Sequence, residues 1–403
     1  MVQPGSTAPI QRAESGSRVE QLDSLRGLAA LSVVVSHHLL VFPAVFEAFK
    51  STPPGPGEAL LLLPPVYIFW AGHSAVVLFF VLSGYVLSLP VFDGRQPTYS
   101  QYVAKRVCRI YLPYLVAVMA ALVGASTLSR GEIPELSSWF RSSWTVPVEP
   151  KHLADHALFL PDFDTERFNN VIWSLVHEMR LSLVFPPLAL LVARQRWQSC
   201  LAVAGCLSLV GCLGPQLDVR FHWLTNYGLT VHYAAMFIVG AILAKHRRWI
   251  ATKLAGMPPA AHLGLVGIGA LLYVSECWHP AARMGSWIHQ VEYLTAVGAA
   301  VLVGCAASAA WLRAAPLRWL GRVSYSLYLW HLPVLLAAVH LGYGRIPLWA
   351  ILILSIVAGI VVAGVMYRLV EAPAAGLAKS IGSKRRPTED IPAGSLRPEG
   401  VPV

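Results

Sequence analysis

The 403-residue chain is poor in charge: Asp, Glu, Lys and Arg make up only 13% of it, whereas about 25% is usual for a soluble domain. Its six cysteines form no C-x-x-C pair and no metal-ligand spacing, so we interpret them as small apolar residues and expect no metal site. The chain has no phosphate-binding glycine loop, no G-x-S-x-G serine elbow and no H-E-x-x-H zinc motif. Residues 1–21 are polar, so we expect no cleavable signal peptide. These absences exclude a soluble enzyme built on one of those motifs.

Apolar residues dominate instead. They make up 56% of the chain, and the mean hydropathy is +0.56. Several apolar runs approach the roughly 20 residues that a bilayer-spanning helix needs, and a backbone in lipid must satisfy its own hydrogen bonds. We therefore predict an all-α, polytopic integral membrane helical bundle of about ten transmembrane helices. They lie, within about three residues, at 25–46, 70–90, 110–128, 171–193, 199–214, 229–245, 259–275, 293–310, 324–342 and 348–368.

The chain has a net charge of +10, and its basic residues lie between the apolar runs and form no single stripe. We therefore expect the lipid bilayer, and no nucleic acid, as a partner of the protein. With the N-terminus inside, 22 of the 31 Lys and Arg residues fall in cytoplasmic segments and 8 fall outside. This bias predicts that both termini are cytoplasmic. We divide the chain into a cytoplasmic N-terminal segment (1–21), a transmembrane domain (22–373) and a disordered basic cytoplasmic tail (374–403).

Titratable side chains inside two predicted spans mark a candidate site, because ionisable residues in hydrocarbon are costly and commonly functional. His37 lies about 18 Å from the inner membrane edge, and Glu178, on a helix that enters from outside, about 20 Å. We predict that these side chains meet in one polar cavity, where the carboxylate would orient the imidazole. Arg180 would face another side of its helix, and His38 would be structural. The alternatives are a structural Glu178–Arg180 network and a His37 bonded only to a backbone carbonyl.

Three further features have both a functional and a structural interpretation. Arg106 and Arg109 would share a helix face and suit a phosphate, although basic residues beside a span also set topology. His331 follows an aromatic-rich helix start that would equally suit the membrane interface. The outer segment 129–170 is long enough to be a lid or a binding surface.

Six short motifs follow one another between residues 22 and 373. They are Leu22-Asp23-x-Leu25-Arg26-Gly27 with the downstream His37, Leu78-Phe79-Phe80-Val81-Leu82-Ser83-Gly84-Tyr85, Arg106-x-x-Arg109, Trp173-Ser174-Leu175-x-x-Glu178, Tyr325-Ser326-Leu327-Tyr328-Leu329-x-His331 and Tyr367-Arg368-Leu369-Val370-Glu371-x-Pro373. Each motif is loose by itself. Together, on a ten-span pattern, they resemble the membrane acyltransferase family 3, the acyl-CoA-dependent O-acyltransferases of polysaccharides and other envelope or secreted molecules.

The resemblance implies an essential catalytic histidine and a set of arginines on the acyl-CoA side. We assign catalysis to His37 and Glu178, acyl-CoA binding to Arg26, Arg106 and Arg109, and substrate binding to His331, Trp173 and Arg180. We expect no permanently bound cofactor. Acyl-CoA, in the form of acetyl-CoA, would be the co-substrate.

We therefore expect an O-acyltransferase of the bacterial inner (plasma) membrane. It would move an acyl group, an acetyl in the simplest case, to a hydroxyl of a glycan, a small molecule or another envelope or exported acceptor. The sequence departs from the family at Val77, where many members have Asp, and after Glu178, where Met-Arg-Leu-Ser replaces an aromatic residue and a Tyr. These departures leave the acceptor unidentified. The alternative function is a transporter or flippase for a polar substrate, although we find no repeat of matching halves.

Overall fold

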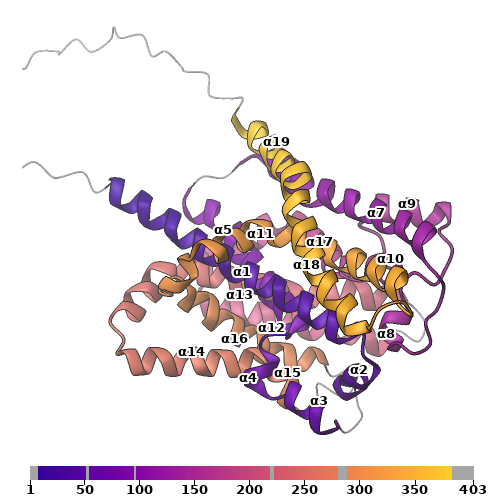
Figure 1. The fold of residues 1–403 in the computed structure, drawn as a ribbon. Coiled ribbons are helices and arrows are strands. Elements are labelled where there is room, and N and C mark those ends of the chain that lie inside the picture. The colour runs from indigo at the N-terminus through magenta and orange to yellow at the C-terminus, as the bar shows by residue number, and fades with distance from the viewer. Residues whose placement is uncertain (1–7, 51–53, 95–96, 218–221, 280–287, 384–403) are drawn as a thin grey trace, which may run out of the picture.

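The computed structural model describes residues 8–50, 54–94, 97–217, 222–279 and 288–383 (Figure 1). These residues form helices and connecting turns, and no β-strand occurs among them. The prediction of an all-α helical protein is confirmed.

The long helices form the bundle, and short ones lie in its connections. The long helices are α1 (Ala8–Leu39), α5 (Gly72–Phe92), α7 (Leu112–Leu128), α11 (Ile172–Arg194), α12 (Trp197–Leu217), α13 (His222–Ala255), α14 (Pro259–Tyr273), α16 (Ile288–Ala306), α17 (Ala315–Gly342), α18 (Leu348–Met366) and α19 (Ala372–Ser383). The short ones are α2 (Pro43–Lys50), α3 (Pro56–Leu61), α4 (Pro64–Tyr67), α6 (Tyr99–Arg106), α8 (Ser138–Arg141), α9 (Pro150–Leu158), α10 (Glu166–Asn169), α15 (Ser275–Trp278) and the 3₁₀ turn η4 (Ala310–Arg313). Two π-helical turns, η1 (Val107–Tyr111) and η5 (Tyr367–Glu371), join α6 to α7 and α18 to α19.

Six helical segments of the described chain are long and apolar enough to cross a membrane. They are α5, α6 through α7, α11, α13, α17, and α18 through α19. The bent pair α1 and α2 adds a seventh if it is one span, whereas α12, α14 and α16 contribute shorter apolar stretches. The protein is therefore a polytopic helical membrane protein. The predicted count of ten spans is not confirmed, although each of the ten predicted ranges contains a helix.

The first helix ends earlier than the predicted span 25–46. It stops at Leu39, and the chain turns by 111° into α2, which begins at Pro43. Proline has no backbone N–H and disfavours helical geometry in the residue before it, so a helix rarely continues through such a position. His37 consequently lies in the last turn of α1, beside the break.

Glycines bring helix backbones into direct contact at two crossings in the bundle. A Cβ at Gly84 of α5 would lie 2.1 Å from the carbonyl oxygen of Phe237 in α13, and one at Gly240 would lie 2.0 Å from a backbone oxygen of α5. A Cβ at Gly27 of α1 would lie 2.6 Å from the backbone nitrogen of Gly321 in α17. Small residues permit such close approach in membranes, where van der Waals packing drives helix association.

We expect Gly84→Ala to lower the melting temperature of the purified protein clearly, because its Cβ would meet a rigid backbone oxygen. Overpacking of this kind typically costs about 1–3 kcal/mol of unfolding free energy. Gly264→Ala on α14 is the matched control, since a Cβ there has no atom within 4 Å. Thermal unfolding in detergent measures both variants, and equal melting temperatures would contradict the crossing described here.

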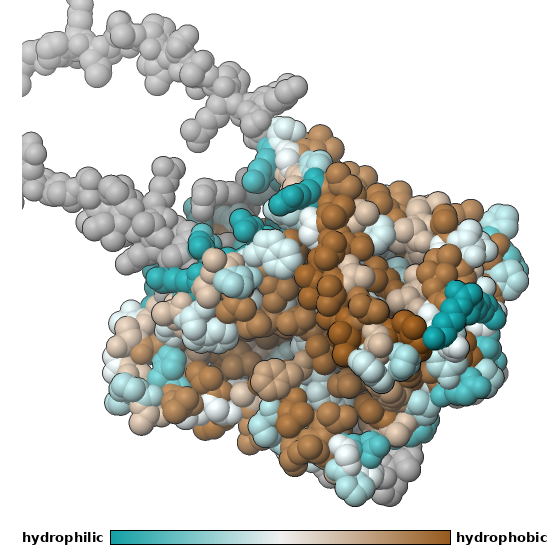
Figure 2. All heavy atoms as spheres, in the orientation of Figure 1, coloured by the Kyte–Doolittle hydropathy of each residue, from teal (hydrophilic) through white to brown (hydrophobic). Residues whose placement is uncertain are grey.

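The exterior suits a lipid environment along the bundle. The outer face of α18 exposes apolar side chains at helical spacing, and Figure 2 shows this face as a continuous hydrophobic surface; its members are Trp349, Ile353, Leu354, Val357, Val361 and Val365. Hydrophilic side chains gather near the described end of α19 (Figure 2). Residues 372–383 are helical, so the predicted disordered tail 374–403 is ordered as far as Ser383, and the rest of it lies outside the described residues.

Candidate active site

His37 is hydrogen-bonded to His331 of α17. Its Nδ1 lies 2.8 Å from His331 Nε2, and the two ring planes are within 19° of each other. The other nitrogen of His331, Nδ1, lies 3.0 Å from the carbonyl oxygen of Leu327. Because a carbonyl can only accept, Nδ1 of a neutral His331 carries the proton, and its Nε2 accepts from His37 Nδ1–H. His37 therefore keeps an unprotonated Nε2, the nitrogen that can act as a base or as a nucleophile.

Residues 129–170, predicted as an outer lid or binding surface, lie over this pair. The ring of Trp139 stacks on His37, with 5.0 Å between ring centroids. Two residues earlier, Ser137 Oγ donates to the carbonyl oxygen of Leu40 at 2.5 Å, and the Ser137 backbone N–H donates to the carbonyl oxygen of Val41 at 3.1 Å. The segment is thus tied to the break at the end of α1.

The remainder of this segment is fixed to the bundle as well. The Tyr114 hydroxyl of α7 donates to the carbonyl oxygen of His156 at 3.0 Å. Burial lowers the pKa of His156 to about 4, so its ring is neutral at pH 7. Trp144 is buried, its indole N–H donates to the Phe168 carbonyl at 3.0 Å, and its φ of 58° is unusual for a bulky residue. Such a backbone persists only where the surroundings hold it, so the segment is a firm cover.

A cavity of about 110 Å³ lies beside His37. Its wall includes His73 at the start of α5, Tyr67 of α4, Trp173 of α11 and Tyr328 of α17. Since a water molecule occupies about 30 Å³, the cavity has room for the reacting groups of a substrate rather than for a whole sugar. Trp173, predicted to bind substrate, reaches this cavity.

Glu178 does not lie beside His37, so the predicted pairing is wrong. Its Oε1 accepts a hydrogen bond from Ser83 Oγ at 3.0 Å, and α5, which carries Ser83, packs against both α1 and α11. Trp173, five residues before Glu178 on α11, is the residue that reaches the cavity. The depth estimate took the start of α11 as a membrane edge, whereas Ile172 at that start is 0% exposed and packed inside the protein.

Glu178 belongs instead to a separate cluster of charges, whose members are partly buried or, in the case of Arg109, exposed. Arg26 interacts electrostatically with Arg109, Glu178 and Glu371, and Arg106 interacts with Arg109 and Glu178. The three arginines assigned to acyl-CoA are therefore brought together. Among the described residues neither Arg106 nor Arg109 forms a salt bridge, which leaves both guanidinium groups able to bind an anion.

Two of the motifs in this cluster form π-helical turns. Arg109 lies in η1 and Glu371 ends η5, and α17 braces both turns. The Tyr325 hydroxyl donates to a backbone carbonyl of η1 at 2.8 Å, and Ser326 donates from its N–H and Oγ to Glu371 Oε2 at 3.1 and 2.6 Å. Arg106 ends α6 and Arg109 lies in η1, so the two arginines are not on one regular α-helix, although they interact electrostatically. Such turns recur at functional sites.

Two other predicted side chains have structural partners. Arg180 donates from Nε and Nη2 to the carbonyl oxygens of residues 160 and 161, both at 2.7 Å, and its guanidinium lies 4.4 Å from the ring centroid of Tyr227. It anchors the covering segment, and its role in substrate binding stays a prediction. His38 bonds to the Val34 carbonyl at 2.7 Å and to Ser355 Oγ at 2.9 Å, which confirms its structural role.

A second titratable cluster, which we did not predict, surrounds Glu292 of α16. Its Oε1 lies 2.5 Å from His73 Nε2 and its Oε2 lies 2.5 Å from His232 Nε2. Tyr233 and His289 also bond to Oε1, both at 3.3 Å. The available signal was a histidine near the start of the second predicted span and a single glutamate at the edge of the eighth. Neither has a motif spacing, so their meeting is visible only in three dimensions.

This cluster also contains potential metal ligands. Atoms of His232, His289 and Glu292 all lie within 4.8 Å of one another. The 2.5 Å between His232 Nε2 and Glu292 Oε2 is, however, a hydrogen-bond length and shorter than the roughly 3.3 Å between donor atoms of a tetrahedral zinc site. We therefore interpret the cluster as a hydrogen-bond network.

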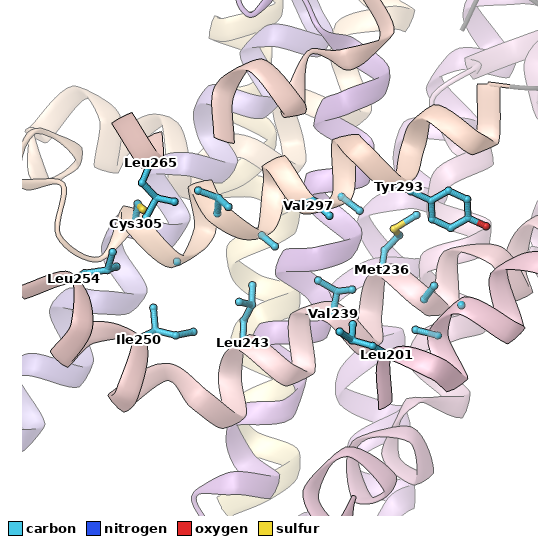
Figure 3. A pocket seen from close by; sticks show the side chains of 17 residues that line it. Leu201, Met236, Val239, Leu243, Ile250, Leu254, Leu265, Tyr293, Val297 and Cys305 are labelled. Carbon is cyan, nitrogen blue, oxygen red and sulfur yellow. The ribbon is translucent and has the colours of Figure 1, made fainter. Parts of the chain in front are cut away.

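A larger cavity of about 460 Å³ lies between α12, α13, α14 and α16 (Figure 3). The labelled side chains that line it are apolar apart from Tyr293 and Cys305. Among the described residues, no Asp, Glu, His, Lys or Arg lines it.

Comparisons with known proteins identify the family. The family model for an acyltransferase domain, Acyl_transf_3, matches residues 19–368. The chain is 26% identical over 405 residues to acyltransferase MdmB of Streptomyces mycarofaciens, covering 93% of this chain and 95% of that protein. It is 27% identical over 222 residues to O-acetyltransferase PaAT-1 of Phomopsis amygdali, covering 47% of this chain and 43% of that protein. It is also 22% identical over 332 residues to O-acetyltransferase OatA of Staphylococcus aureus (strain NCTC 8325 / PS 47), covering 75% of this chain and 52% of that protein. The chain thus spans about half the length of these two O-acetyltransferases. No solved structure matches the chain.

Proposed function

The chain belongs to this acyltransferase family, and from that premise we propose that it transfers an acyl group from acyl-CoA to a hydroxyl of a glycan or of another envelope or exported acceptor. It would act as an O-acyltransferase in the bacterial inner (plasma) membrane, with both termini in the cytoplasm and acetyl-CoA as the simplest donor. The match to relatives named acyltransferases and O-acetyltransferases supports this class over a transporter or flippase.

The observation that carries the proposal is the His37–His331 pair. His331 holds His37 in the tautomer with a free Nε2, and that nitrogen belongs to a ring in the wall of the 110 Å³ cavity. An imidazole fixed in this way is equipped for acyl transfer, either by taking the proton of a hydroxyl or by accepting the acyl group itself. The aromatic wall and Trp139 would limit access of bulk water.

The arginine cluster supports acyl-CoA as the donor. Arg26 lies eleven residues before His37 on α1, which corresponds to about 16 Å of helix. Arg106 and Arg109 add two guanidinium groups that can hold phosphate oxygens by paired hydrogen bonds. The phosphates would bind in this cluster, and the thioester arm would extend along the bundle to the cavity.

We expect Arg106→Ala and Arg109→Ala each to raise KM for acetyl-CoA about ten- to a hundredfold, with a smaller effect on KM for the acceptor. A hydrogen bond to a charged group contributes about 1.5–3 kcal/mol, and a phosphate contact acts mainly in ground-state binding. Lysine at either position should rescue only partly, because it lacks the planar fork. Arg345→Ala, in the exposed turn after α17, is the control. Unchanged KM for acetyl-CoA in both variants would mean that the two arginines only set topology.

The proposed function is tested with purified protein in detergent. Release of CoA from acetyl-CoA is followed with a thiol reagent in the presence of candidate glycan and polyol acceptors, and acylated products are identified by mass spectrometry. Acceptor-dependent CoA release that disappears in His37→Ala is expected. No release from acetyl-CoA or from longer acyl-CoAs with any acceptor would overturn the proposed donor.

A further inference from the structure

His73 has a place in the cavity wall that the proposed function does not use. Its side chain is 22% exposed and lines the same cavity as His37. Its ring lies nearly parallel to that of Trp173, with 6.0 Å between centroids. Because the carboxylate of Glu292 can only accept, His73 Nε2 carries the proton of the 2.5 Å bond to Glu292, and in the neutral form of His73 its Nδ1 keeps a lone pair. Among the described residues none hydrogen-bonds to this Nδ1.

Two buried carboxylates flank this imidazole. Glu292 is 0% exposed and accepts from four donors, an arrangement that stabilises a carboxylate in its charged form. Glu276 is 3% exposed, and its Oε1 lies 3.9 Å from His73 Nε2 with no hydrogen-bond partner in the described chain. A positive charge that forms on His73 would therefore be compensated at once. A histidine backed by a buried carboxylate is a common arrangement for a general base.

A second base is needed if the free Nε2 of His37 acts as the nucleophile. If this nitrogen accepts the acyl group, it can no longer take the proton of the incoming hydroxyl. His331 cannot take that proton either, because its Nε2 is engaged with His37 Nδ1 and its Nδ1 with a backbone carbonyl. In the cavity wall, the neutral form of His73 offers a second imidazole nitrogen with an unbonded lone pair.

We propose that acyl transfer runs through an acyl group on His37 and that His73 is the catalytic base that deprotonates the acceptor hydroxyl, with Glu292 as its positioning residue. In the first step His37 Nε2 attacks the thioester carbonyl, the C–S bond breaks, and CoA leaves as a thiolate that takes a proton from solvent. In the second step the acceptor oxygen attacks the acyl carbon and the bond to Nε2 breaks. The acceptor proton passes to His73 Nδ1 and from there to solvent. The proposal rests on the proposed acyl-CoA donor.

The experiment separates the two steps in purified full-length protein. Exchange of isotope-labelled CoA into acetyl-CoA, without an acceptor, reports the first step alone. Hydrolysis of acetyl-CoA uses water, an acceptor that needs a base, whereas acetyl transfer to hydroxylamine uses an acceptor that needs none. These three rates are measured for wild type, His73→Asn, Glu292→Gln and His37→Ala, with His262→Asn on α14 as a histidine control outside both clusters.

We expect His73→Asn to lose about 10²- to 10⁴-fold in hydrolysis while CoA exchange and hydroxylamine transfer stay within about threefold of wild type, since a general base contributes about that factor. Glu292→Gln should show the same pattern with a smaller loss. His37→Ala should lose all three rates, and His262→Asn none. A merely structural role for His73 would lower the three rates together and would overturn the proposal, as would normal hydrolysis in His73→Asn. Wild type that turns over acetyl-CoA without CoA exchange would also overturn it, whereas no turnover of acetyl-CoA at all would refute the proposed donor instead.

Discussion

Replacement of His37 by alanine should abolish acyl transfer while the protein still folds and inserts. The variant lacks the only nitrogen of the His37–His331 pair that is free to react. Loss of a general base costs about 10²- to 10⁴-fold in rate, and loss of a nucleophile can cost about 10⁶-fold. We therefore expect the rate of CoA release to fall by about 10⁴-fold or more, and the KM for acetyl-CoA to change little, because its phosphates would bind elsewhere.

His38→Ala is the matched control for this variant. It removes a neighbouring imidazole that bonds to Val34 and Ser355 and has no place in the cavity wall. We expect a lower melting temperature but a rate close to that of wild type. Near-normal turnover in a correctly folded His37→Ala protein would show that the reaction is carried by another group.

The second large effect is expected at His331, which acts on the reaction through His37. His331→Leu removes the acceptor for His37 Nδ1–H, so the proton can move to Nε2 and block the reactive nitrogen. We expect kcat to fall by about 10²- to 10⁴-fold with little change in KM, as is typical when a catalytic histidine loses the group that fixes its tautomer.

His331→Gln distinguishes this role from simple packing. The side-chain carbonyl of glutamine can accept a hydrogen bond near the position of Nε2, so it should restore a substantial part of kcat, whereas leucine should not. Steady-state kinetics of both variants, with melting temperatures as a check on folding, measure the difference. Equal losses in the two variants would contradict the tautomer argument.

The sequence was sufficient for features that depend on local pattern. Apolar runs located the helices, and the basic motifs named three arginines that the structure brings together. The end of α1 was misplaced because Pro43 was not weighed as a stop signal within an apolar run. Helices and short motifs can be predicted in this way because they depend on the periodicity and length of short stretches of sequence.

The partners of those residues could not be found in this way. Counting residues along a helix estimates depth but not lateral position, and it assumes that a helix begins at the membrane edge. The predicted pairing of Glu178 failed on both grounds. The start of α11 is buried inside the protein, and Glu178 faces Ser83 of α5. His331 was assigned to substrate binding with no link to His37, yet it lies beside His37 although 294 residues separate them. Only the packing of α1 against α17 decides that pair.

The glycine crossing of α1 and α17 has a consequence for how this site can be altered. Gly27 contacts Gly321, and His37 and His331 each follow ten residues later, so both contacts join positions 294 apart. The two helices therefore run in the same direction and keep one register over about 15 Å. One residue inserted between Gly27 and His37 would rotate His37 by about 100° around the axis of α1, away from His331. An insertion in α17 would rotate His331 around the axis of α17 and would not bring His37 back. A chimera that exchanges one of these helices with a relative's would need both segments from one parent to remain active.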